Sequence, residues 1–185
     1  SDEEYRHGSV NAELKFMKDK ICLITGTASG MGRIAAKSLA EKGTILILVD
    51  FDTENGIAAR DEIIEATGNK SIEYIDCDVS SFSELQRLSD YIHEHYSRLD
   101  VLINNAGITE SMRRENEDGF EMTLATNFLG PFLLSHLMLD LLQAAAPSRI
   151  INISSDAHRM VKEFDFDDIN NRKRWNKINH GTGFQ

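Results

Sequence analysis

Three glycines follow the first apolar run of the chain and have the spacing of a phosphate-binding turn. The segment TGTASGMG (25–32) lies between the run KICLIT and the amphipathic stretch RIAAKSLAEKG. Gly26 permits a tight turn, Gly30 lets the backbone approach a pyrophosphate, and Gly32 lets the helix pack close to the sheet. The start of that helix presents N–H groups and the positive end of its dipole to an anion. This arrangement predicts dinucleotide binding.

A carboxylate ends the second apolar run, 18 residues after Gly32. Asp50 has the position to hydrogen-bond the adenosine ribose hydroxyls, and its charge would repel the 2′-phosphate of NADP. Phe51 follows it where an arginine would bind that phosphate, and Arg33 lies one turn into the helix. These residues favour NAD over NADP as the cofactor. The alternative is that Asp50 only caps the segment that follows.

Short apolar runs alternate with longer stretches of helical periodicity along the chain. We expect strands at 20–25, 45–50, 71–76, 100–105 and 149–154, and helices at 31–43, 54–67, 82–97 and 118–145. Several of these strands are apolar at successive positions, as is typical of strands covered on both faces. The alternation predicts an α/β fold of the Rossmann type, with a doubly wound parallel sheet. We expect one domain over 1–185, with a polar leader at 1–17 and an irregular segment at 156–185.

The composition argues against several classes of partner. A formal net charge of −10 and a pI near 5.0 disfavour binding to nucleic acids or to anionic membrane surfaces. The sequence contains neither a signal peptide nor an apolar run long enough to span a membrane, so we expect a cytoplasmic location. Cys22 and Cys77 lie in apolar runs and are expected to be buried thiols without a disulfide. His93 and His95, two apart on a probable helix, make a poor metal pair, and no metal site is expected.

Three motifs in order resemble the short-chain dehydrogenase/reductase family over about residues 18 to 156. They are TGTASGMG, the strand end Cys77-Asp78-Val79 and the turn Asn104-Asn105-Ala106-Gly107. In the family, the aspartate matching Asp78 contacts the adenine amino group, and the Asn-Ala-Gly turn lines the cofactor groove. The resemblance therefore implies that eleven residues surround the dinucleotide: Gly26, Ser29, Gly30, Met31, Gly32, Asp50, Asp78, Val79, Asn105, Ala106 and Gly107.

The stretch ATNFLGPFLLS (125–135) resembles the family's Asn-x-x-Gly-x-Phe segment, with Asn127 as the matching asparagine. Pro131 lacks the N–H that would bond the carbonyl of Asn127, so we expect a kink there with a free main-chain oxygen. In the family this asparagine holds a water for proton relay, which implies a catalytic role for Asn127. An ordinary helix bend is the alternative.

The run RIINISSDAH (149–158) resembles the strand that carries the family's catalytic serine, and the pattern selects Ser155. That serine hydrogen-bonds the substrate oxygen while hydride passes between the substrate and the nicotinamide. The family's acid/base tyrosine, and the lysine four residues later that lowers its pKa, have no counterpart in register. The four tyrosines all precede Ser155: Tyr5, Tyr74, Tyr91 and Tyr96. We expect the Tyr-x-x-x-Lys helix and the final strands to lie beyond Gln185.

The segment after Ser155 resembles the insertion of retinol-dehydrogenase-like members of this family. The resemblance implies an NAD(P)-dependent oxidoreductase that interconverts a small-molecule alcohol and a carbonyl compound. It further implies a homo-oligomer for the full-length protein and an inactive chain without the tyrosine. The alternative is a dinucleotide-binding regulatory module that has no catalytic activity.

Overall fold

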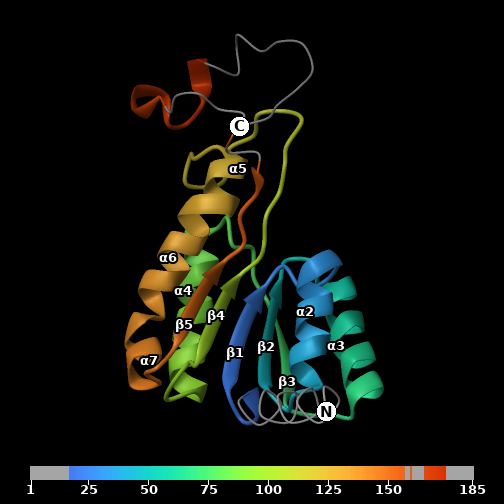
Figure 1. The fold of residues 1–185 in the computed structure, drawn as a ribbon. Helices are drawn as coiled ribbons and strands as arrows, with labels where there is room; N and C mark the ends of the chain where they lie inside the picture. Colours follow the sequence, from blue (N-terminus) through green and yellow to red (C-terminus); the bar gives the residue numbers. More distant parts are fainter. Residues whose placement is uncertain (1–16, 157–158, 160–164, 174–185) are drawn as a thin grey trace, which may run out of the picture.

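A single five-stranded parallel sheet forms the centre of the molecule, in the strand order β3-β2-β1-β4-β5 (Figure 1). The computed structural model describes residues 17–156, 159 and 165–173. The strands are β1 (Ile21–Thr25), β2 (Ile45–Asp50), β3 (Ile72–Asp76), β4 (Val101–Asn104) and β5 (Arg149–Asn152). All five predicted strands are present, each ending within two residues of its expected bounds, and the Rossmann-type fold is confirmed.

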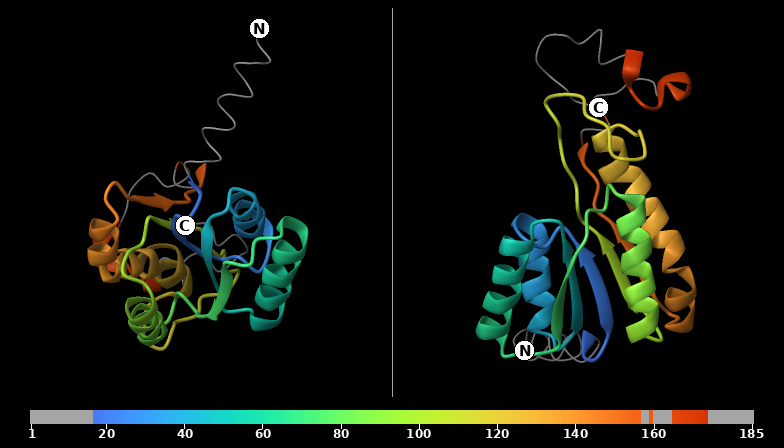
Figure 2. Two further views of the ribbon diagram at one scale, coloured as in Figure 1. Left: turned by 90° about the horizontal axis from the view of Figure 1, so that it is seen from below. Right: turned by 180° about the vertical axis from the view of Figure 1, so that it is seen from behind.

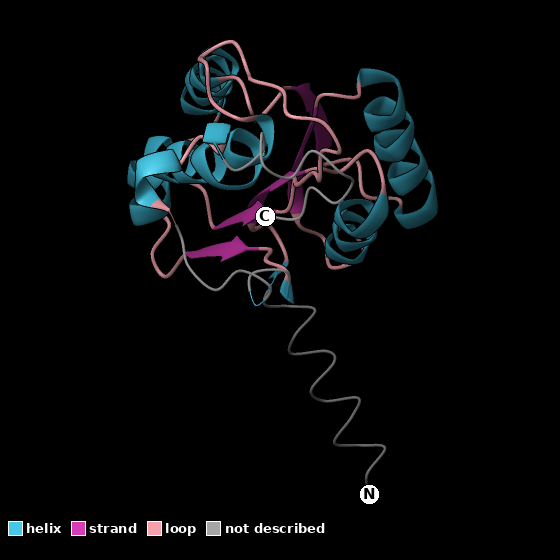
Figure 3. Cartoon of the chain, turned by 90° about the horizontal axis from the view of Figure 1, so that it is seen from above, coloured by secondary structure: helices cyan, strands magenta, loops and turns pink. Residues whose placement is uncertain are grey.

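Helices cover the sheet on both of its faces (Figures 2 and 3). The helical elements of the described residues are α2 (Gly30–Ala40), α3 (Thr53–Thr67), α4 (Phe82–His95), α5 (Met122–Leu124), the π-helical turn η1 (Ala125–Leu129), α6 (Gly130–Leu137), α7 (Leu139–Ala144) and the 3-10 turn η3 (Phe166–Asp168). The strand order reverses between β1 and β4, because the chain builds outward through β2 and β3 before it returns. Ligands of such sheets bind beyond the carboxyl ends of the strands at this switch point.

Successive side chains of the central strands enter two separate hydrophobic cores. Leu23 and Val49 pack with side chains of α4, α6 and α7, whereas Ile24 packs with side chains of α2 and α3. The strands are therefore buried on both faces, which explains their continuous apolar runs. Cys77 belongs to the first core and Cys22 to the second, and both are free, buried thiols as expected.

Strand β5 differs from the other strands in its exposure. Ile150 and Ile151 of β5 are 42% and 40% exposed, and Ile153 just after the strand is 48% exposed. The reason is position, since β5 pairs with β4 alone and forms an edge of the sheet within the described part of the chain.

The continuous helix expected over 118–145 is wrong at its start. The residues before α5 form a turn in which the N–H of Asn116 donates to the carbonyl of Phe120 at 2.8 Å. Gly119 has a φ of 80°, which favours glycine and ends any regular helix there. The side-chain oxygen of Asn116 also accepts from the N–H groups of Asp118 and Phe120, so local polar bonds outcompete a helical turn.

The remainder of that stretch is a helix with a wide turn in its middle. In η1 the N–H of Gly130 donates to the carbonyl of Ala125, five residues earlier instead of four. Pro131 follows immediately and has no N–H to donate to the preceding turn, which accounts for an irregular helix at this point. The expected irregularity therefore takes the form of a π-helical turn that contains Asn127.

Candidate functional site

A cleft of about 530 Å³ lies at the carboxyl ends of the strands, at the switch point beside β1 and β4. Its volume is within the range of ~300–1,000 Å³ that is usual for small-molecule sites. Of the residues expected to bind the coenzyme, all except Gly32 line it: Gly26, Ser29, Gly30, Met31, Asp50, Asp78, Val79, Asn105, Ala106 and Gly107. The sequence thus identified residues from four separate segments that the fold brings together.

The three glycines of the turn meet three different steric requirements. Gly26 has a φ of 72°, and a Cβ on it would lie 2.8 Å from the Cα of Ala106. A Cβ on Gly32 would lie 2.0 Å from the carbonyl oxygen of Gly26, so Gly32 allows the helix to pack against the turn. Gly30 has a φ of 55° and nothing within 4 Å of its Cβ position, so its backbone borders open space.

The Asn105 side chain ties the glycine turn to the end of β4. Its Nδ2 donates to the carbonyl oxygens of Thr25 and Gly26 at 2.9 and 3.0 Å. In return, the N–H groups of Asn105 and Ala106 both donate to Oγ1 of Thr25 at 3.0 Å. These bonds fix the two walls of the cleft relative to one another.

The start of α2 faces the cleft without a competing anion. Its N-cap residue, Ser29, makes no side-chain cap bond, and the first turn of the helix contains no acidic residue. Ser29, Gly30 and Met31 line the cleft, so the positive end of the helix dipole lies at its wall. This surface fits a phosphate group.

Asp50 holds two loops together at the other end of the cleft. Its carboxylate accepts from the N–H of Ala28 at 2.8 Å and from the N–H of Asp52 at 3.1 Å. The N-cap of α3 is Asp52, whose side chain accepts from the N–H of Asn55, so Asp50 does not cap that helix. Phe51 also lines the cleft and is 68% exposed.

Arg33, the basic residue considered as a ligand of the NADP 2′-phosphate, makes its contacts outside the cleft. Arg33 forms an ion pair with Glu62 of α3 and does not line the cleft. The cleft wall does include the Arg114 side chain, but that guanidinium is paired with Glu110, and this pairing raises the Arg114 pKa. The acidic groups Asp50, Asp52 and Asp78 therefore dominate the charge of the lining.

Residues at the end of β3 form the floor of the cleft. Oδ1 of Asp78 accepts from the N–H of Ser80 at 2.8 Å, and the N–H of Asp78 donates to Glu84 of α4 at 2.7 Å. Cys77 also lines the cleft, but burial raises the pKa of its thiol to about 12. The thiol therefore stays protonated at neutral pH and cannot serve as a nucleophile.

Asn127 lies beside the cleft and not in its lining. Its side-chain amide pairs with the backbone of Ile108, accepting from the N–H at 2.8 Å and donating to the carbonyl at 2.9 Å. Ile108 and Thr126, its neighbours in space and in sequence, do line the cleft. The π-helical turn is thus fixed to the segment that follows β4.

Ser155 lies just beyond the end of β5 and is exposed. Nδ2 of Asn104 donates to Oδ1 of Asn152 at 2.8 Å and to Ser135 of α6 at 3.1 Å. The N–H of Ile153 then donates to the carbonyl of Asn104 at 3.0 Å. These contacts hold the strand that leads to Ser155 against β4, although Ser155 does not line the cleft.

The described tyrosines make structural hydrogen bonds and do not line the cleft. The Tyr74 hydroxyl donates to the carbonyl of Asp50 at 2.7 Å, and burial, with nearby carboxylates, raises the Tyr74 pKa to about 12. Tyr91 and Tyr96 both donate to Glu73, and the pKa of each is raised, for Tyr91 chiefly by that bond and for Tyr96 chiefly by burial. Tyr5 lies outside the described residues.

Comparison with known proteins agrees with this geometry. A family model described as short chain dehydrogenase matches residues 20–164, well over half of the chain. The chain belongs to the short-chain dehydrogenase family. This family consists of nucleotide-binding oxidoreductases of the Rossmann fold, and the family resemblance drawn from the motifs is confirmed.

Alignment with individual short-chain dehydrogenases shows what share of their length this chain matches. The chain is 39% identical to human (Homo sapiens) retinol dehydrogenase 13 over 168 residues, which is 91% of this chain and 50% of that protein. It is 36% identical to human retinol dehydrogenase 11 over 157 residues, 85% of this chain and 49% of that protein. The chain therefore spans about half the length of the curated relatives it matches.

Two solved structures resemble the fold of this chain. A protein of Mycobacterium paratuberculosis has 33% identity and a TM-score of 0.70, with 84% of this chain and 53% of that chain covered. The RhlG/NADP active-site complex of Pseudomonas aeruginosa has 28% identity and a TM-score of 0.68, with coverage of 83% and 60%. No helix within the described residues has the length and apolar character needed to cross a membrane.

Several lining residues of this short-chain dehydrogenase were not identified from the sequence. They are Ala28, Val49, Phe51, Asp52, Cys77, Ile108, Glu110, Arg114, Met122 and Thr126. Most of them adjoin a recognised motif in the sequence, so their place in the cleft could have been predicted from that position. Glu110, Arg114 and Met122 carry no such signal, because they reach the cleft through the path of a long loop.

Gly32→Ala and Gly30→Ala form a matched pair that separates packing from backbone strain. We expect Gly32→Ala to lower the free energy of unfolding by about 3 kcal/mol, because its Cβ overlaps the Gly26 carbonyl oxygen. Gly30→Ala has space and should cost only about 1 kcal/mol for its left-handed backbone. Urea unfolding of both variants measures the difference. Equal losses would contradict the packing role of Gly32.

Proposed function

We propose that this chain forms the coenzyme-binding part of an NAD-dependent oxidoreductase that interconverts an alcohol and a carbonyl compound. One observation carries the proposal: the open backbone at Gly30 and the uncapped start of α2 face a cleft that also contains the Asp50 carboxylate. The first two features fit a pyrophosphate, and the third fits ribose hydroxyls. When bound, the nicotinamide coenzyme supplies or accepts the hydride.

Ser155 and Asn127 are the residues of this chain that we propose to act on the substrate side. Ser155 would hydrogen-bond the substrate oxygen, and its place after β5 puts it at the carboxyl end of a strand adjoining β4. Asn127 would hold a water with its main-chain oxygen. Its side-chain amide is occupied by Ile108, and Pro131 has no N–H to offer that oxygen.

The preference for NAD rests on charge. Asp50 and Asp52 line the cleft together with the uncharged Phe51, and a 2′-phosphate placed among them would be repelled. The name of the RhlG/NADP complex indicates that RhlG binds NADP. The relative affinity of this chain for NADH and NADPH is therefore the quantity to measure. The names of the retinol dehydrogenases support an apolar alcohol or aldehyde as substrate. A cytoplasmic location and a homo-oligomeric full-length protein remain part of the proposal.

The alternative function is a dinucleotide-binding regulatory module. The positions of the described tyrosines support it, since Tyr74, Tyr91 and Tyr96 do not line the cleft. The coding sequence beyond Gln185 separates the two functions. A Tyr-x-x-x-Lys motif within the next helical turns supports the dehydrogenase, and its absence there supports the module.

The chain should bind NADH, and Gly30→Val should abolish that binding. A valine side chain at Gly30 would project into the open space that we assign to the pyrophosphate. Enhancement of the nicotinamide fluorescence on titration measures the dissociation constant. Phe132→Ser, at an exposed position of α6 outside the cleft lining, serves as the control. Unchanged NADH affinity in Gly30→Val would refute the phosphate assignment.

Asp50→Asn should shift the coenzyme preference toward NADPH. The amide keeps a hydrogen-bond acceptor for the Ala28 or Asp52 N–H but removes the charge that would repel the 2′-phosphate. We expect the ratio of NADPH to NADH affinity to rise about tenfold, or ~1.4 kcal/mol. Asp90→Asn, at an exposed position of α4 outside the cleft lining, is the control for the loss of one carboxylate charge. An equal shift in the control would remove the special role of Asp50.

The 185-residue chain should show no appreciable alcohol oxidation. None of the described tyrosines is positioned to take the hydroxyl proton. The assay mixes the chain with NAD and retinol and follows NADH formation. Ser155→Ala is the matching variant, and turnover that disappears with this substitution would show that the chain already contains a complete catalytic set.

A further inference from the structure

The cleft is closed on one side by a loop that another segment holds in place. Beyond the Asn105-Ala106-Gly107 turn, the chain passes the carboxyl ends of the strands before it enters α5 (Figure 1). Glu110 and Arg114 of this loop line the cleft, as does Met122 at the start of α5. The loop thus contributes a wall to the cleft without belonging to the sheet.

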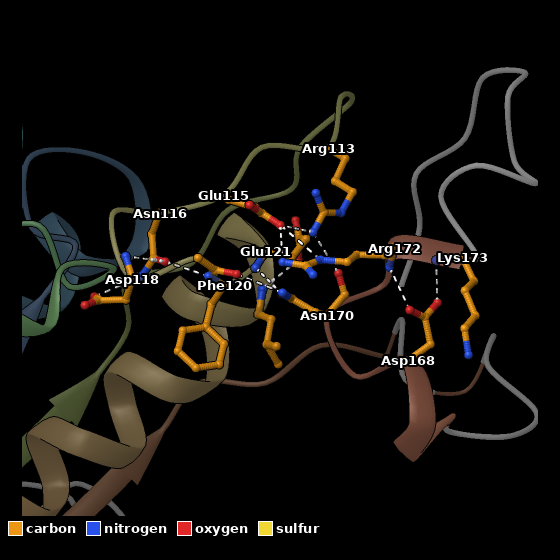
Figure 4. A network of polar contacts seen from close by, with 12 residues as sticks. Arg113, Glu115, Asn116, Asp118, Phe120, Glu121, Asp168, Asn170, Arg172 and Lys173 are labelled. Carbon is orange, nitrogen blue, oxygen red and sulfur yellow. Dashed lines mark hydrogen bonds and ion pairs between the residues drawn. The ribbon is translucent and has the colours of Figure 1, made fainter.

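Asn170, which follows η3, contacts this loop at three points (Figure 4). Its Oδ1 accepts from the N–H of Glu121 at 2.5 Å, and its Nδ2 donates to the carbonyl of Gly119 at 2.8 Å. Its own carbonyl accepts from Arg113 at 3.2 Å. One side chain therefore satisfies a backbone donor and a backbone acceptor of the loop, which fixes both the position and the direction of the chain there.

Charged groups reinforce the same contact. Glu115 of the loop accepts from Arg113 at 2.6 Å and from Arg172 at 3.0 Å, and the bonds from these two guanidinium groups hold its pKa below the usual value. Asp168 accepts from the N–H groups of Arg172 and Lys173, so the segment itself is held in a defined turn (Figure 4).

The contact continues from the loop into the cleft through Glu121. This buried residue donates its N–H to Asn170, while its carboxylate accepts from the N–H groups of Thr123 and Leu124 at 2.9 Å each. Glu121 is thereby the N-cap of α5. Met122 of α5 and Thr126 of the following turn η1 both line the cleft.

We propose that Asn170 is a positioning residue for the coenzyme cleft, although it does not line that cleft. It ties the segment 165–173 to the loop and to the start of α5, and so holds the cleft wall in the conformation that binds coenzyme. The inference rests on the proposed function. It implies that occupation of the coenzyme cleft and order in a segment that follows Ser155 are coupled.

The direct test is NADH binding by Asn170→Ala in the 185-residue chain. Loss of the two side-chain bonds should raise the NADH dissociation constant about tenfold. Without these bonds the loop is less ordered before binding, and part of the free energy of NADH binding is used to order it. Lys173→Ala is the matched control, since it lies in the same segment but contributes only its main-chain N–H to the contacts described. Thermal melting of both variants shows whether they are folded.

Hydrogen exchange provides a second readout that a merely structural role would not move. Since coupling is reciprocal, NADH should slow amide exchange in 165–173 of the wild-type chain, even though these residues do not line the cleft. In Asn170→Ala, amides in 119–124 should exchange faster, whereas those in 26–32 should not change.

The outcomes separate the two proposals. If the wild-type chain binds neither NADH nor NADPH, the proposed function is overturned, and the positioning role falls with it. If the wild-type chain binds and Asn170→Ala binds equally well, only the positioning role is overturned. If Asn170→Ala does not fold, the wild-type exchange experiment decides, and NADH without effect on 165–173 overturns the coupling.

Discussion

The close approach of the glycine turn to the end of β4 is the constraint on which the rest of the site depends. The side-chain amide of Asn105 lies between the two and donates to the carbonyl oxygens of Thr25 and Gly26. A Cβ atom has no room at Gly26 or Gly32. If this contact opened, α2 would shift relative to the sheet and its uncapped start would no longer face the cleft. The position of the proposed phosphate site is therefore decided by steric exclusion and by one amide side chain.

The strands and the phosphate turn could be predicted from the sequence because their causes are local. A buried parallel strand needs a continuous apolar run, and a left-handed turn at Gly26 needs glycine. The break in the helix expected over 118–145 also has local causes, in Asn116, Gly119 and Pro131. The kink at Pro131 was expected for this reason, whereas the turn at Asn116 and Gly119, which delays the start of the helix to Met122, was not.

The contacts of Asn170 could not have been predicted in the same way. They join the Asn170 side chain to main-chain groups about 50 positions earlier in the sequence. Hydrogen bonds of this kind produce no periodic pattern of residue types. The same holds for Glu110 and Arg114, whose place in the cleft depends on the path of the loop. Asn127 lies between these cases. Its motif could be recognised in the sequence, whereas the hydrogen bonds of its side chain with Ile108 are seen only in the three-dimensional structure.

The exposed edge at β5 has a practical consequence for any work with this chain in solution. A strand edge with isoleucines at about half exposure is a template for pairing with another copy. A net charge of −10 opposes such pairing through mutual repulsion, but salt at 0.1 M screens that repulsion beyond about 10 Å. The colloidal stability of the chain should therefore fall as the ionic strength rises.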